Sequence, residues 1–180
     1  MLTEINNALE VLRNGGTILY PTDTIWGIGC DATSEDAVAK IFKIKKREEK
    51  KSLISLVANK EQLKSITGKI PNLDITSNPT TVIYPYAIGL SKNLLANNGS
   101  AGIRIVQDDF CQLLIRKFGK AIVSSSANIS GTNSPRKFSE ISNEIRLGVD
   151  YIVNLRHDQL MIKPSTILMI NEDENITKIR

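Results

Sequence analysis

The sequence predicts an α/β fold in which helices flank an open, twisted, mixed sheet. Short apolar stretches typical of buried strands alternate with apolar stripes at helical spacing, and no repeat, low-complexity segment or Pro/Gly/Ser-rich linker divides them. The length of 180 residues is that of one ordinary domain with a sizeable apolar core. We therefore expect one domain over residues 1–180.

Helices and strands alternate through the first half of the chain. The apolar spacing predicts a helix over 3–14, which Gly15-Gly16 ends. A second helix begins after the capping residue Ser34, and its last turn carries a run of basic residues. The other elements expected here are a strand over 17–20, a strand over 53–57 and a helix that begins at Asn59.

The second half continues the alternation. Arg104 alternates with two isoleucines in a predicted strand, so its side chain faces either solvent or a polar pocket. Small hydroxyl residues stand at two predicted strand ends, Thr22 to Thr24 and Ser124 to Ser126, where side chains are presented to ligands. The elements expected are strands over 80–84 and 102–106, a helix capped by Asp108, a strand over 121–123, a helix near 138–147, and strands near 151–154, 166–170 and 175–179.

The composition is that of an ordinary folded protein. Hydrophobic residues make up 41% and charged residues 23%, with a mean hydropathy of −0.11, which argues against a disordered, collagen-like or coiled-coil chain. The apolar stretches are far shorter than the ~20 residues that span a bilayer, and the N-terminus lacks the basic and apolar regions of a signal peptide. We expect a cytoplasmic protein without membrane association.

The few cysteine and histidine residues exclude several kinds of site. Cys30 and Cys111 are the only cysteines, so we expect neither a disulfide framework nor a zinc cluster, and two buried, inert thiols. The single histidine, His157, excludes a two-histidine metal site. His157 could be the base of a Ser–His–Asp triad, but the chain has no G-x-S-x-G motif to supply the serine. We therefore expect His157 to be a surface histidine in a loop.

Positive charge is concentrated in one short segment. Residues 40–51 contain seven Lys and Arg residues and two Glu residues, and so carry more positive charge than the net +4 of the whole chain. This excess indicates an anionic partner, either a phosphorylated small molecule or a nucleic acid. A solvated helix end with favourable charges is the alternative.

No local phosphate motif is complete, since the chain has no Walker sequence and Gly27-Ile28-Gly29 lacks the third glycine of a dinucleotide turn. What remains is a set of hydroxyl, amide and cationic side chains at predicted strand and helix ends. Any one of them has an ordinary role as a turn former, but together with the basic segment they indicate a binding site. They are Thr24, Lys45, Arg47, Lys51, Arg104, Ser124, Ser126, Asn128, Ser165 and Thr166.

Four motifs in order resemble those of the YrdC/TsaC threonylcarbamoyl-adenylate synthases. They are Tyr20-Pro21-Thr22-Asp23-Thr24-Ile25-Trp26-Gly27-Ile28-Gly29-Cys30-Asp31-Ala32, Lys45-x-Arg47-x-x-x-Lys51, Ser124-x-Ser126-Ala127-Asn128-Ile129-Ser130-Gly131 and Lys163-Pro164-Ser165-Thr166-Ile167. The resemblance implies a YrdC-like open sheet around a large basic cavity. It also implies the reaction of L-threonine, bicarbonate and ATP to threonylcarbamoyl-AMP and pyrophosphate, for the t6A37 modification of tRNA.

The resemblance also implies site residues. Lys45 and Arg47 would be catalytic, because the transfer requires neutralisation of a triphosphate. L-threonine would contact Thr24, Arg104, Ser124 and Ser165. ATP would contact Lys45, Arg47, Lys51, Ser100, Ser126, Asn128, Ser134 and Arg180. No residue is an obvious general base, and Mg²⁺ would be held by ATP and water, with no protein metal ligand.

The resemblance implies partners as well, and two alternatives stay open. The short form of the family passes its product to a separate tRNA threonylcarbamoyl-transferase complex. One alternative is a non-catalytic module that binds tRNA or double-stranded RNA; another is the related domain of carbamoyl-transferring hydrogenase-maturation proteins. The chain departs from the family in the shortened 63–79 region, at Asn78-Pro79-Thr80-Thr81, at Glu48, and at Trp26, which is either a pocket wall or part of the core.

Overall fold

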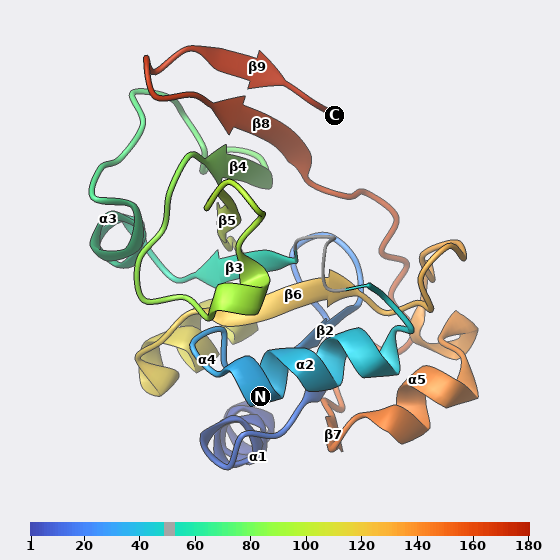
Figure 1. Cartoon of the computed structure of the whole chain (residues 1–180). Coiled ribbons are helices and arrows are strands. Elements are labelled where there is room, and N and C mark those ends of the chain that lie inside the picture. Colours follow the sequence, from blue (N-terminus) through green and yellow to red (C-terminus); the bar gives the residue numbers. More distant parts are fainter. Residues whose placement is uncertain (49–52) are drawn as a thin grey trace.

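The computed structural model describes residues 1–48 and 53–180, and a mixed sheet forms its centre (Figure 1). Its strands run in the order β7-β1-β2-β6-β3-β5-β4-β8-β9. The pairs β1/β7, β3/β5 and β4/β8 are parallel and the others antiparallel, which confirms the predicted α/β fold with a mixed sheet. The strands are β1 (Ile18–Tyr20), β2 (Gly27–Gly29), β3 (Ile54–Val57), β4 (Thr80–Tyr84), β5 (Ala101–Ile105), β6 (Ile122–Ser126), β7 (Tyr151–Ile152), β8 (Thr166–Ile170) and β9 (Ile176–Lys178).

Three of the helices begin where the sequence predicts caps. The side chains of Ser34, Asn59 and Asp108 each accept a hydrogen bond from the backbone N–H three residues further on, which satisfies one of the free donors of a helix start. The α-helices are α1 (Leu2–Arg13), α2 (Glu35–Ile44), α3 (Lys60–Thr67), α4 (Asp109–Phe118) and α5 (Asn143–Gly148), with 3-10 turns at η1 (Lys92–Leu94) and η2 (Phe138–Glu140).

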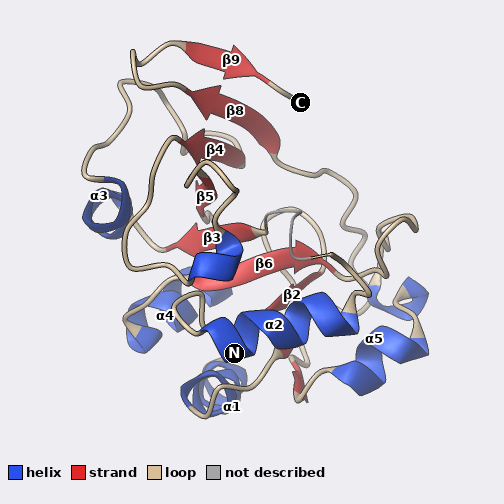
Figure 2. Cartoon of the chain, viewed as in Figure 1, coloured by secondary structure: helices blue, strands red, loops and turns tan. Residues whose placement is uncertain are grey.

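Helices lie on both faces of the sheet (Figures 1 and 2). The buried apolar residues of α1 and α4 pack with Ile18, Tyr20, Leu56 and Ile122 of the strands. The buried residues of α2 and α3 pack in a second cluster with strand residues of opposite parity, including Leu19. Because successive side chains of a strand point to opposite faces, the two clusters are the two sides of one sheet.

The face under α1 and α4 continues beyond these helices. On β5, Ile103 and Ile105 belong to the cluster with α2 and α3, so Gly102 and Arg104 point to the same side as Leu56 and Ile122. We call the part of this face over β3, β5, β4, β8 and the end of β6 the open half. It carries the candidate site.

Several elements differ from the sequence prediction. Strand β2 is missing from the prediction because it contains two glycines; a Cβ atom at Gly29 would lie 2.4 Å from the Val123 carbonyl oxygen and 2.7 Å from the Tyr20 ring, so only glycine fits between these neighbours. Strand β6 does not end at residue 123 but continues through Ser126. The helix near 138–147 is divided into η2 and α5.

Three further expectations concern single residues and the membrane. Both cysteines are buried, as predicted, and burial raises the pKa of each thiol. His157 lies in a loop but is not freely exposed: its ring stacks on Phe138, with centroids 3.8 Å apart. No helix within the described residues has the length and apolar character needed to cross a membrane.

Candidate active site

A cavity of about 590 Å³ lies over the open half of the sheet. Its floor consists of two rows of side chains that are neighbours through the strand register. The first row is Ser124, Ile54, Gly102, Ile83 and Met169, from β6, β3, β5, β4 and β8 in turn, and the second contains Arg104, Thr81 and Ile167. This floor combines three polar side chains, those of Ser124, Arg104 and Thr81, with apolar ones, as expected of a site that binds an amphipathic ligand.

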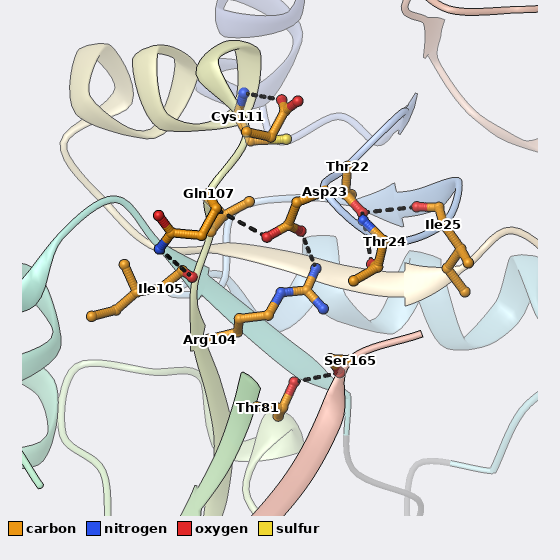
Figure 3. A network of polar contacts seen from close by, with 12 residues as sticks. Thr22, Asp23, Thr24, Ile25, Thr81, Arg104, Ile105, Gln107, Cys111 and Ser165 are labelled. Atoms are coloured by element: carbon orange, nitrogen blue, oxygen red, sulfur yellow. Dashed lines mark hydrogen bonds and ion pairs between the residues drawn. The ribbon is translucent and has the colours of Figure 1, made fainter. Parts of the chain in front are cut away.

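Arg104 is the buried cation of the floor. Its guanidinium Nη2 lies 3.0 Å from Oδ1 of Asp23, and both side chains are at least nine-tenths buried. Oδ2 of Asp23 accepts a hydrogen bond of 2.9 Å from the backbone N–H of Gln107, which ties the β1–β2 loop to the end of β5 (Figure 3). The sequence left two orientations for the Arg104 side chain, toward solvent or into a polar pocket, and the structure shows that it points into the pocket. Its Nε has no hydrogen-bond partner among the described residues and is a donor available to a ligand.

Thr24 reaches the cavity from the loop between β1 and β2. The hydroxyl of Thr22 donates to the carbonyl of Ile25, accepts from the backbone N–H of Thr24, and lies 2.9 Å from the Thr24 hydroxyl. These contacts fix the loop without a helix or strand, so that Thr24 lines the cavity beside Arg104 (Figure 3).

A second pair of hydroxyl groups lies across the floor. Oγ1 of Thr81 is 2.8 Å from Oγ of Ser165, and both residues are buried. The carbonyl oxygen of Ser165 accepts hydrogen bonds from Nε and Nη2 of Arg180 at 3.3 and 3.1 Å. The segment before β8 and the C-terminal arginine therefore form one wall.

Arg47 enters the cavity because α2 ends in a tight turn. Lys46 has a left-handed φ of 48°, and the backbone N–H of Arg47 donates to the carbonyl of Phe42, the six-to-one bond of a Schellman motif. Arg47 lines the cavity, and partial burial lowers the pKa of its guanidinium. The residue that follows a helix end is thus turned toward the site by the helix-ending motif itself.

Lys45 lies behind the cavity wall. Its ammonium is buried and donates hydrogen bonds to the carbonyl oxygens of Ser126 and Asn128, the second at 2.6 Å, while its own carbonyl accepts from the N–H of Ser130. Burial, and next the charge of Arg47, lowers the pKa of Lys45 to about 8. Lys45 therefore ties the end of α2 to the loop that follows β6.

Most of the residues predicted from the sequence come together in this cavity. Those that line it are Thr24, Arg47, Ser100, Arg104, Ser124, Ser126, Ser134, Ser165 and Arg180. Lys45 is placed as described above, and the amide of Asn128 donates to the carbonyls of Ile129 and Thr132, so neither side chain is among the lining residues. Lys51 lies outside the described residues.

Sequence reasoning missed three polar residues of the lining, Thr81, Ser125 and Arg136. Thr81 sits in the register position opposite Arg104, a signal that requires the strand pairing. Arg136 lies two positions after Ser134, and a basic residue so close to a predicted ligand was the available hint. Among the described residues, the charged side chains of the lining are all arginines: Arg47, Arg104, Arg136 and Arg180.

Trp26 belongs to the core rather than to the pocket wall. It is fully buried and contacts the rings of Phe138 and His157, with centroids 5.2 and 5.6 Å away. The stack packs the loop after β6 against the segment that follows β7.

Sequence comparison gives one family and a set of relatives. Residues 10–180 match the family model Sua5_yciO_yrdC, described as "Telomere recombination". Similar proteins named threonylcarbamoyl-AMP synthase occur in Methylococcus capsulatus, 36% identical over 72% of this chain and 73% of the relative. Others occur in Enterobacter sp. (strain 638), 32% identical over 84% of each chain, and in Blochmanniella pennsylvanica, 32% identical over 89% of this chain and 85% of the relative.

Solved structures have the same fold. A doubly substituted P. abyssi Sua5 matches with a TM-score of 0.87 at 25% identity, over 98% of this chain and 55% of that one, so this chain spans about half of its length. P. abyssi Sua5 complexed with L-threonine has a TM-score of 0.83 at 22% identity, over 98% of this chain and 53% of that one. E. coli YciO has a TM-score of 0.83 at 22% identity, over 100% of this chain and 89% of that one.

Proposed function

The chain belongs to the Sua5/YciO/YrdC family as a threonylcarbamoyl-AMP synthase, and we propose that its three substrates, L-threonine, bicarbonate and ATP, meet in the cavity over the open half of the sheet. The observation that carries this proposal is the combination, in one cavity, of a buried arginine flanked by hydroxyl groups with further arginines on the walls. The first arrangement suits an amino acid and the second a triphosphate.

The L-threonine subsite would be formed by Thr24, Arg104, Ser124 and Ser165. Arg104 would pair with the carboxylate through the donors that Asp23 leaves available, and the hydroxyls would fix the amine and the side chain. Bicarbonate would react with the amine held beside them to give the carbamate N-carboxy-threonine, with loss of water. Holding these groups in contact replaces a bimolecular encounter, so positioning supplies much of the rate.

The nucleotide would lie along the arginine-bearing walls. In the transfer, an oxygen of the carbamate group of N-carboxy-threonine forms a bond to the α-phosphorus of ATP, the bond from that phosphorus to the bridging oxygen breaks, and pyrophosphate leaves with both electrons. Arg47, with Lys51, would neutralise the charge that develops on the phosphates. The contacts of Ser100, Ser126, Ser134 and Arg180 with ATP are proposed from their places in the lining. Mg²⁺ would enter with ATP, coordinated by phosphate oxygens and water.

Lys45 and Asn128 would serve the nucleotide indirectly. The Lys45 ammonium holds the carbonyls of Ser126 and Asn128, and the Asn128 amide holds the turn that follows. We propose that both are positioning residues for Ser126 and for the adjacent Arg47, in place of the direct contact that the motif implies. The adenylate product would be passed to a tRNA threonylcarbamoyl-transferase complex.

Pyrophosphate release from ATP tests the proposal. With Mg²⁺ and bicarbonate present, release should require L-threonine, be weaker with L-serine, and fall at least a hundredfold in Arg47→Ala. Absence of threonine-dependent release, together with retained binding of tRNA or double-stranded RNA, would replace the proposal with the RNA-binding alternative.

A further inference from the structure

The hydroxyl groups of Thr81 and Ser165 form a hydrogen-bonded pair that leaves one of their two protons without an acceptor among the described residues. Both side chains are buried, Thr81 at 1% and Ser165 at 3% exposed, and their oxygens are 2.8 Å apart. Each hydroxyl has one proton, and neither makes another hydrogen bond within residues 1–48 and 53–180. One proton therefore lies between the two oxygens, and the other is available to whatever occupies the cavity that both residues line.

The place of this pair indicates which group it serves. Thr81 is the cross-strand partner of Arg104, so the two side chains stand next to each other on the open half of the sheet. Figure 3 shows Arg104 between the Thr24 loop and the Thr81–Ser165 pair. A ligand carboxylate that binds Arg104 would thus lie beside the pair, and an ionised carboxylate accepts hydrogen bonds but donates none.

We propose that Thr81 is a positioning residue for recognition of L-threonine: its hydroxyl donates to Ser165 and so leaves the Ser165 proton for the substrate carboxylate. This inference rests on the proposed function, because it takes the ligand at Arg104 to be an amino acid. It assigns a role to a residue that the motifs do not contain. The opposite direction, from Ser165 to Thr81, would turn a lone pair of Ser165 toward the carboxylate.

Substitutions at Thr81 separate the hydroxyl from the shape of the side chain. Thr81→Val removes the hydroxyl and keeps the volume, whereas Thr81→Ser keeps the hydroxyl and removes the methyl group. Thr80→Val is the matched control, since the Thr80 hydroxyl bonds the carbonyl of Asn78 and Thr80 is not among the lining residues. Thr81→Ala replaces the valine variant if that protein does not fold.

Steady-state pyrophosphate release then gives KM for threonine and for ATP separately. We expect Thr81→Val to raise KM for threonine about tenfold, the effect of weakening one hydrogen bond to a charged group, and to leave KM for ATP within about twofold. Thr81→Ser and Thr80→Val should stay within about threefold of the wild type for both substrates. Thr81→Val should have no further effect when added to Ser165→Ala, because the residue acts through Ser165.

Each other outcome overturns the inference. An unchanged KM for threonine in Thr81→Val removes the role, and equal rises in both KM values would mean a general structural effect. Independent effects of Thr81→Val and Ser165→Ala would show that Thr81 acts without Ser165. Failure of the proposed function is distinguishable, since the wild type would then release no pyrophosphate in response to threonine.

Discussion

The buried pair of Asp23 and Arg104 offers a direct test of how the site is held together. Asp23→Asn keeps the shape of the side chain and an oxygen that can accept from the Gln107 N–H, but leaves the guanidinium without its counter-charge. At 3.0 Å and an effective dielectric constant near 20, the pair gains about 5 kcal/mol of Coulomb energy. Loss of one partner of a buried pair typically costs about 3–5 kcal/mol, and because Arg104 borders a cavity that water can enter, we expect the lower end, about 3 kcal/mol.

The assay is urea unfolding of a double-mutant cycle without ligand. Asp23→Asn and Arg104→Met should each lower the free energy of unfolding by about 3 kcal/mol, since each leaves one buried charge unpaired. The double variant leaves neither charge, so its loss should be smaller than the sum by about 2–3 kcal/mol. For a domain of this size, 3 kcal/mol corresponds to a fall in Tm of about 6–12 °C.

Additive losses in this cycle would refute the reasoning, because they would mean that the two charges do not interact. A loss below about 0.5 kcal/mol in Asp23→Asn would also refute it, and would show that water in the cavity already solvates the guanidinium. Saturating L-threonine provides a further readout. Its carboxylate gives Arg104 a new partner, so it should protect Asp23→Asn more than the wild type.

Three further predictions concern other parts of the site. Because the pKa of Lys45 falls to about 8 in the folded protein, the native state loses this proton at a lower pH than the unfolded chain does. Urea titrations should therefore show the wild type gaining about 3 kcal/mol of unfolding free energy, relative to Lys45→Met, between pH 8 and 10.5. A difference between the two proteins that stays constant with pH would contradict this. A Cβ atom at Gly102 would lie 3.6 Å from the Thr81 methyl carbon without a clash, so Gly102→Ala should fold with unchanged or slightly higher Tm but raise KM for threonine, and an unchanged KM would show that the substrate lies elsewhere. Arg136→Ala should raise KM for ATP about fivefold while Lys137→Ala, whose side chain does not line the cavity, should not; equal effects would indicate only general charge attraction.

The sequence predicted three of the helix starts well, because a cap is a local device. Ser34, Asn59 and Asp108 each bond a backbone N–H three residues away, so the signal and its cause lie in the same short segment. Strand β2 was missed because its glycines reduce the strand signal of the segment, and the reason for Gly29 is its close contact with Tyr20 and Val123, which only the folded sheet brings near. Such contacts leave no pattern in the segment itself.

The candidate site shows the same division. The motifs predicted Thr24 and Ser124, and the strand pattern together with the family resemblance predicted Arg104; the structure brings all three into one cavity. Thr81 could not be found in this way, since its relation to Arg104 is a strand register and its relation to Ser165 crosses 84 positions of sequence. For Lys45 the motif was misleading about the contact. Its place in the motif predicts a contact with the ATP phosphates, whereas in the structure its buried ammonium donates to two backbone carbonyls.

The cavity arises from a change of residue type along strands that continue out of the core. On β6, Ile122 is fully buried under α1 and α4, and Ser124, two residues later on the same side, lines the cavity. On β5, Arg104 lines the cavity and Val106, just beyond the strand, returns to the cluster with α4. The polar groups are therefore attached to backbone that the apolar core already fixes, and they need no separate scaffold. Rigid placement of this kind is what a reaction that depends on positioning requires, because the hydroxyls and the guanidinium are in place before the substrates arrive.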